Sequence, residues 1–171
     1  MDTDGHTNFN DDDFKNTVNR LLLIMRVIGG AFTCAALTFI AVAFKLSEQG
    51  VKAQTVNLPI HGETQFAGVI ILLVILAFMV GKLVQNLEIK KPDPGEDKPA
   101  NTPEGLLMAS YIVKLALLEA ASIFAFIGCF AGEIDFSLTA TVIVAIAVLM
   151  VASIPSRSSV ESFIRKSSGR L

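Results

Sequence analysis

Charged residues are scarce in this sequence of 171 residues, and long parts of it hold almost none. Lysine, arginine, aspartate and glutamate make up 18% of the chain, whereas hydrophobic residues make up 52%. Four stretches are almost free of charge: 27–44, 64–81, 115–132 and 136–156. Glu119, in the third stretch, is their one charged residue. A soluble helical core would show a polar stripe with the helical period, and VIILLVILAFMV at 69–80 has none. The composition therefore argues against a soluble globular domain.

Cysteine and histidine are equally scarce, with two residues of each. Cys34 and Cys129 fall at different distances from the basic residue that precedes their stretch, so no disulfide is expected. His6 and His61 lie in separate polar segments, away from any serine or cysteine nucleophile. There is no glycine-rich phosphate loop, and so few ligands placed this way do not form a metal site. We therefore expect no enzymatic activity, no cofactor and no metal.

Each uncharged stretch is close to the length that crosses a membrane. A helix rises about 1.5 Å per residue, so about 20 residues cross a hydrocarbon core of about 30 Å. We predict an all-α fold, a four-transmembrane-helix antiparallel bundle that forms a single membrane domain over residues 1–171. The predicted spans are about 22–45, 66–86, 107–131 and 136–155. The expected surrounding is the lipid bilayer, and the expected location is the inner membrane of the cell, as a multi-pass protein.

The polar segments carry helix signals of their own. The stretch 88–102 is rich in proline and mixed charge, which predicts a disordered cytoplasmic linker. It ends at Thr102, which together with Pro103 predicts the start of a helix. An amphipathic tail helix is predicted over 158–167, starting with a capping box of Ser158 and Glu161. We expect this tail helix to lie on the membrane surface.

The distribution of basic residues predicts the orientation. With the amino terminus inside the cell, 12 of the 14 lysines and arginines face the cytoplasm, and only Lys45 and Lys52 face outward. Positive charge in short loops collects on the cytoplasmic side. Both termini are therefore predicted to be cytoplasmic. These residues form no patch with interleaved aromatics, and the net charge is −2, so no nucleic-acid partner is expected.

Glu119 is the candidate intramembrane site. An ionised carboxylate at a bilayer centre costs on the order of 3 kcal/mol, so it calls for a partner, water or a proton. Arg26 lies at a matching depth on the first span and is the preferred partner, with Lys82 as the second candidate. Three interpretations stay open: a structural ion pair or protonated carboxyl, a carboxylate that carries protons or ions, and a contact with lipid headgroups.

Small residues predict where the helices pack, because they let two backbones approach closely. The first span has such residues at Gly29, Gly30 and Thr33. The third has a seam on the side opposite Glu119, made of Ala121, Ala125, Gly128 and Gly132. These faces favour a non-enzymatic accessory or oligomerising membrane subunit, with a homo-oligomer or a larger membrane complex as candidate partners.

Two resemblances add to this interpretation. LALLEAASIFAFI at 115–127 resembles the carboxylate-bearing helix of the rotary ATPase proteolipid, the c subunit. That resemblance implies that Glu119 carries a proton or a sodium ion, so a proteolipid-like translocating component is the alternative function. Residues 106–166, including IPSRSSVESFI at 154–164, look like a group of small bacterial four-span proteins with no assigned function. The second resemblance implies an integral protein of the bacterial inner membrane.

Overall fold

The computed structural model describes residues 11–49, 62–85 and 102–167. Within these ranges the chain forms five helices and no strand, so the all-α prediction is confirmed for this part of the protein. The helices are α1 (Asp11–Glu48), α2 (Glu63–Gln85), α3 (Pro103–Phe130), α4 (Phe136–Ala152) and α5 (Arg157–Ser167). The linker predicted over 88–102 lies outside the described residues, apart from Thr102.

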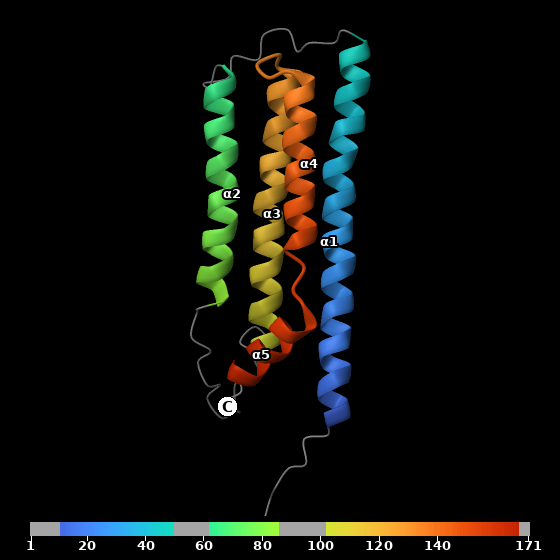
Figure 1. The fold of residues 1–171 in the computed structure, drawn as a ribbon, viewed down its shortest axis with the longest axis vertical. Helices are drawn as coiled ribbons and strands as arrows, with labels where there is room; N and C mark the ends of the chain where they lie inside the picture. The colour runs from blue at the N-terminus through green and yellow to red at the C-terminus, as the bar shows by residue number, and fades with distance from the viewer. Residues whose placement is uncertain (1–10, 50–61, 86–101, 168–171) are drawn as a thin grey trace, which may run out of the picture.

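Helices α1 to α4 stand side by side and alternate in direction along the chain (Figure 1). α3 is central and contacts α1, α2, α4 and α5. α1 and α4 also contact each other, whereas α2 contacts no described helix except α3. The arrangement is therefore a three-helix cluster of α1, α3 and α4, with α2 added on another side of α3.

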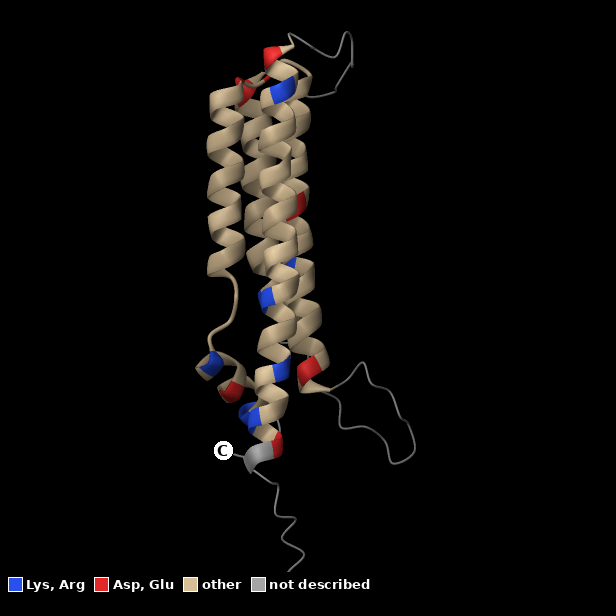
Figure 2. Ribbon diagram, turned by 90° about the vertical axis from the view of Figure 1, so that its right-hand side faces the viewer, with Lys and Arg blue, Asp and Glu red and all other residues tan. Residues whose placement is uncertain are grey.

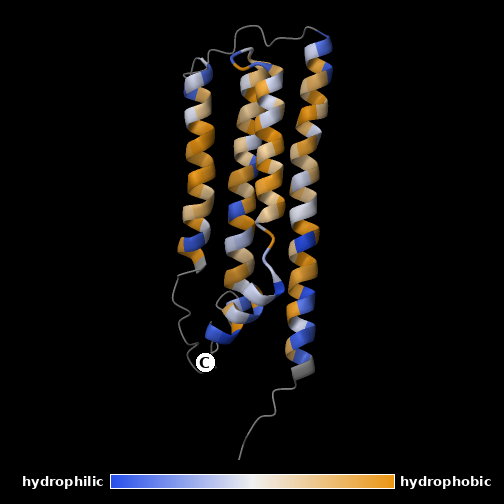
Figure 3. Cartoon of the chain, viewed as in Figure 1, coloured by the Kyte–Doolittle hydropathy of each residue, from blue (hydrophilic) through white to orange (hydrophobic). Residues whose placement is uncertain are grey.

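The central parts of the four long helices are mostly hydrophobic (Figure 3). α1, α2 and α3 are each long and apolar enough to cross a membrane, and α4 with α5 gives a fourth candidate if this pair, bent by 55°, counts as one span. Large apolar side chains point outward, among them Leu83 and Val148, which are 65% and 61% exposed. The helices are thus compatible with a multi-pass membrane protein.

Most charged residues lie toward the two ends of the bundle (Figure 2). Eight of the nine lysines and arginines whose side chains the structure describes lie in the half that carries α5; these are Lys15, Arg20, Arg26, Lys82, Lys114, Arg157, Arg165 and Lys166. Lys45 lies at the opposite end, in the last turn of α1. The two ends of the bundle therefore differ in charge.

The start of α3 follows the sequence prediction. Thr102 is the N-cap, and its side-chain oxygen accepts a hydrogen bond from the backbone N–H of Gly105 at 3.1 Å. Pro103 occupies the first turn, where a missing N–H costs nothing. The predicted helix start at Thr102 and Pro103 is therefore confirmed.

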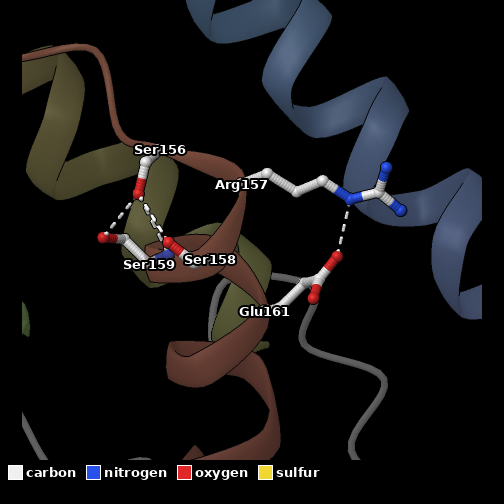
Figure 4. Close-up of polar contacts among 5 residues, drawn as sticks. All are labelled: Ser156, Arg157, Ser158, Ser159 and Glu161. Atoms are coloured by element: carbon white, nitrogen blue, oxygen red, sulfur yellow. Dashed lines mark hydrogen bonds and ion pairs between the residues drawn. The ribbon is translucent and has the colours of Figure 1, made fainter.

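The predicted capping box of α5 is wrong, because the cap of the helix lies two residues earlier. Ser156 is the residue that caps it, and its Oγ accepts a hydrogen bond from the backbone N–H of Ser159 at 3.3 Å (Figure 4). Glu161 pairs with Arg157 instead, with Nε and Oε1 2.7 Å apart. Ser158 therefore lies inside the helix. The Glu161 carboxylate pairs with the side chain one turn before it and not with the backbone at the helix start.

The apolar face of α5 packs on the protein. Val160 and Ile164 are buried in the same core as Val18 of α1 and Leu107 of α3. The guanidinium of Arg165 lies 5.3 Å from the ring centroid of Phe14 on α1, within the range of a cation–π contact. This packing buries the apolar face of α5, the face that the sequence predicted to lie on the membrane surface.

Candidate functional site

Glu119 lies near the middle of α3, on the side that faces α1. Phe126 follows it by two helical turns on the same face and packs on Phe39 of α1, with ring centroids 5.6 Å apart. Ser110 and Gly128 are nine residues away in either direction, which is half a revolution, and both contact α2. The body of α3 therefore separates the Glu119 carboxyl from α2.

The Glu119 side chain is half-buried, and one of its oxygens is fully enclosed. Oε2 is buried and has no hydrogen-bond partner among the residues that the structure describes. An ionised carboxylate is costly where one of its oxygens is enclosed without a hydrogen-bond donor or a cation beside it. Protonation of Glu119, or a hydrogen bond from a further donor, would therefore lower the free-energy cost of burying this carboxyl group.

Arg26 and Glu119 are not brought together. α1 and α3 run in the same direction (Figure 1), and the contact between Phe39 and Phe126 places Arg26 level with Val113, about 9 Å along the axis from Glu119. Arg26 also lies about 140° around α1 from Phe39, and its side chain is exposed. Depth and direction both separate the two side chains, and the described residues show no ion pair between them.

The structure places Lys82 beside Lys114. Both line a cavity of about 200 Å³ between α2, α3 and the segment that follows α4. Nζ of Lys114 lies 3.9 Å from the ring centroid of Phe78, which is a cation–π contact. Sequence reasoning missed this cavity, because three segments far apart in the chain form it. The one signal was that both lysines flank uncharged stretches at the same end of the bundle.

α2 packs along the small-residue seam of α3. Ala121, Ala125 and Gly128 are buried. A Cβ added at Gly128 would lie 2.6 Å from Cδ1 of Ile134 and 2.8 Å from Cδ1 of Phe66, so any side chain there would force its neighbours apart. This part of the predicted packing face is therefore occupied by the chain's own second helix.

A buried hydrogen bond joins α2 and α3 near their other ends. Oγ of Ser110 donates to the backbone oxygen of Gly81 at 2.7 Å. Hydroxyl groups that bond a neighbouring backbone stabilise helix pairs in membranes, and a glycine allows the approach. Sequence reasoning missed this pair, although a glycine in an apolar stretch and a serine one turn before Lys114 are its signals.

Gly132 belongs to the turn after α3 and has no place in the seam. It has a φ of 77°, a left-handed conformation that favours glycine. The backbone N–H of Glu133 donates to the oxygen of Gly128 at 3.0 Å and closes the end of the helix. The Glu133 carboxylate accepts from the backbone N–H of Gly62 at 2.8 Å, which ties this turn to the start of α2.

Of the small residues predicted to pack on the first span, Gly29 makes the close contact. A Cβ at Gly29 would collide with Oη of Tyr111, a buried hydroxyl that has no hydrogen-bond partner among the described residues. Nothing lies within 4 Å of a Cβ added at Gly30. The hydroxyl of Thr33 donates to the backbone oxygen of Gly29 at 2.8 Å, within α1 itself. The packed face of α1 therefore passes through Gly29 and leaves Gly30 outside.

Among the described residues, no group of three histidine, cysteine, aspartate or glutamate side chains could hold a metal ion. Comparison with known protein families, with curated proteins and with solved structures found no match to this chain.

Proposed function

We propose that this chain is an integral protein of the inner membrane that crosses the bilayer four times, with both termini in the cytoplasm. The 17 residues of α4 span about 25 Å, close to the thickness of a hydrocarbon core. The concentration of lysine and arginine in the half that carries α5 supports the orientation, because short cytoplasmic segments are rich in basic residues.

Its proposed role is that of a non-enzymatic subunit that associates with copies of itself, or with other membrane proteins, through one face of α3. The observation that carries this proposal is that α1 and α2 do not contact each other, so no described helix covers the side of α3 between them. Ile112, Ile123 and Ile127 on that side are each exposed by 38–39%. Ala109 and Ala116 are exposed beside them and would let a further helix approach closely. We refer to these five residues, with Glu119 at their edge, as the open face of α3.

A second helix on the open face would also supply what Glu119 lacks. Polar side chains and backbone groups of a neighbouring helix form hydrogen bonds across such contacts in membranes. Oε2 of Glu119 has no partner within the described part of a single chain. Because Oε2 is enclosed within the single chain, association at this edge would satisfy it once the Glu119 side chain turns toward the open face.

Disulfide crosslinking between copies tests this role. In a chain with Cys34→Ala and Cys129→Ala, Ile123→Cys places a thiol on the open face of α3, and Val148→Cys places one on the exposed side of α4. Oxidation in membranes should give a crosslinked dimer for Ile123→Cys and much less for Val148→Cys. Equal crosslinking at both positions, or none at either with no co-purifying partner, would contradict the proposed role.

A second candidate function is supported by the buried Oε2 atom alone. A half-buried carboxyl without a partner in the described chain could take up and release a proton or an ion, as in the proteolipid-like alternative. In proteoliposomes, Glu119→Gln should then abolish flux while Glu119→Asp retains part of it, and a carbodiimide should label the wild type at neutral pH. Glu119→Gln that folds normally and leaves any flux unchanged would remove this alternative.

A further inference from the structure

We propose that the cavity shared by Lys82 and Lys114 binds the phosphate headgroup of an anionic phospholipid. This inference goes beyond the proposed function, because the cavity lies on the opposite side of α3 from the open face and involves neither Glu119 nor a second copy. Its ligand class follows from the charge of the cavity, from its depth and from the surfaces that flank it.

The charge that the described residues give to the cavity is positive. No acidic residue lines it, and neither lysine has a carboxylate partner in the ranges that the structure describes. Lys82 is exposed, and Lys114 is half-buried with its ammonium over the ring of Phe78. Two lysines from different helices that line one cavity form an attractive site for a phosphate group.

The remaining polar groups of the cavity favour recognition by charge. Oγ of Ser110 donates its proton to the oxygen of Gly81, and Oγ of Ser153 donates to the oxygen of Leu149 at 2.6 Å. Both hydroxyl protons are therefore already used. Tyr111 also lines the cavity, but its hydroxyl lies against Gly29 of α1, so the lysines are the donors left for a ligand. Lysine binds phosphate as a point charge with little directional preference. We therefore expect selection for anionic over zwitterionic lipids and weak selection among anionic headgroups.

The depth of the cavity points to a lipid rather than a free phosphate ion. Lys82 is in the last turn of α2, and Ser153 is the C-cap of α4, so the cavity lies where two candidate spans end. A headgroup in a bilayer occupies this level, at the edge of the hydrocarbon core. The volume of about 200 Å³ has room for several water molecules and thus for a phosphate group.

The crease between α2 and α4 offers a place for the acyl chain. These two helices do not contact each other. Near the other end of the same crease lies a cavity of about 150 Å³ whose lining is almost entirely apolar, with Ile71 on one wall and Val142 on the other. A chain that starts at Lys114 and follows α3 toward Ala125 would run about 16 Å along this crease, close to the depth of one leaflet.

Lipid retention by the full-length protein tests the proposal. The chain is purified in mild detergent and titrated with phosphatidylglycerol or with phosphatidylcholine of the same acyl chains, and bound lipid is counted by native mass spectrometry. The variants are Lys82→Gln and Lys114→Gln, with Lys114→Arg as a variant that keeps the charge. Arg26→Gln is the matched control, because it removes one positive charge at nearly the same depth as Lys114 but from the exposed side of α1.

We expect phosphatidylglycerol to bind more tightly than phosphatidylcholine. Each lysine-to-glutamine change should weaken phosphatidylglycerol binding about fivefold, and Arg26→Gln less than twofold. Lys82 is exposed, so loss of folding cannot explain the effect of its replacement. Equal binding of the two lipids, or an effect of Arg26→Gln as large as that of Lys82→Gln, would overturn the proposal. Displacement of phosphatidylglycerol by an equal concentration of glycerol phosphate would overturn its assignment to a lipid.

Discussion

Replacing Gly29 with alanine should weaken the contact between α1 and α3, and removing the hydroxyl of Tyr111 should undo that loss. The structure leaves no room for a Cβ at Gly29, because Oη of Tyr111 occupies the place that it would take. The same oxygen is buried and has no hydrogen-bond partner among the described residues. One atom therefore determines the outcome of both substitutions.

The expected magnitudes follow from overpacking and from the unsatisfied hydroxyl. An extra methyl group in a packed helix contact costs about 1–3 kcal/mol. A buried hydroxyl without a partner costs about 1–3 kcal/mol of desolvation, so Tyr111→Phe should leave the free energy of unfolding unchanged or raise it. Combined with Gly29→Ala, it should restore at least half of the lost stability, which corresponds to a coupling energy of about 1 kcal/mol.

Unfolding in mixed detergent and SDS micelles, followed by far-UV circular dichroism, measures these free energies. Gly30→Ala is the matched control, since it makes the same change one residue along and nothing lies within 4 Å of the added Cβ. It should be neutral or stabilising, because alanine exceeds glycine in helix propensity by up to about 1 kcal/mol. Equal destabilisation by Gly29→Ala and Gly30→Ala, or the absence of rescue by Tyr111→Phe, would refute the reasoning.

Three further substitutions test other contacts of the bundle. Gly128→Ala should destabilise by about 1–3 kcal/mol in the same assay, because its Cβ would overlap two side chains; Gly68→Ala, with open space around it, should not. Ser110→Ala should cost about 0.6–1.5 kcal/mol through loss of the bond to Gly81, and a smaller loss than for the exposed Ser47→Ala would contradict that bond. Ser156→Ala should speed amide hydrogen exchange in α5 by roughly fivefold, a loss of about 1 kcal/mol of capping, and unchanged exchange would show that Ser156 is not the cap.

The helices of this chain could be predicted from its sequence because their signals are local. Uncharged stretches bounded by charged residues mark the long helices, and each predicted span falls largely within one helix. The start of α3 needs only Thr102 and the residues just after it. Even local signals can compete, as in the tail, where Ser156 and Ser158 both suit an N-cap and the helix begins after the first.

The contacts between helices could not be predicted in the same way, because each depends on a partner far along the chain. Gly29 and Gly30 are equivalent in the sequence, and only Tyr111 of α3 distinguishes them. The pairing of Arg26 with Glu119 assumed that depth could be counted from the nearest basic residue. In the structure, the packing of aromatic rings sets the register between α1 and α3 and places the two side chains at different levels.

The cavity at Lys82 and Lys114 could not be predicted from the sequence for the same reason. Each lysine alone suggests only the edge of a span. Their proximity depends on α2 packing along the seam of α3 and on α4 ending at the same level. A functional site of this kind is visible only after the packing of three helices is known.

Cysteine labelling from the two sides of the membrane tests the central claim most directly. In a chain with Cys34→Ala and Cys129→Ala, the variants Asp13→Cys, Lys45→Cys and Ser159→Cys each place one exposed thiol near an end of the bundle. A membrane-impermeant maleimide should label Lys45→Cys in intact cells, and the other two only after permeabilisation. Labelling of Asp13→Cys and Ser159→Cys from opposite sides, or of all three in intact cells, would contradict a chain that crosses the bilayer four times with both termini inside.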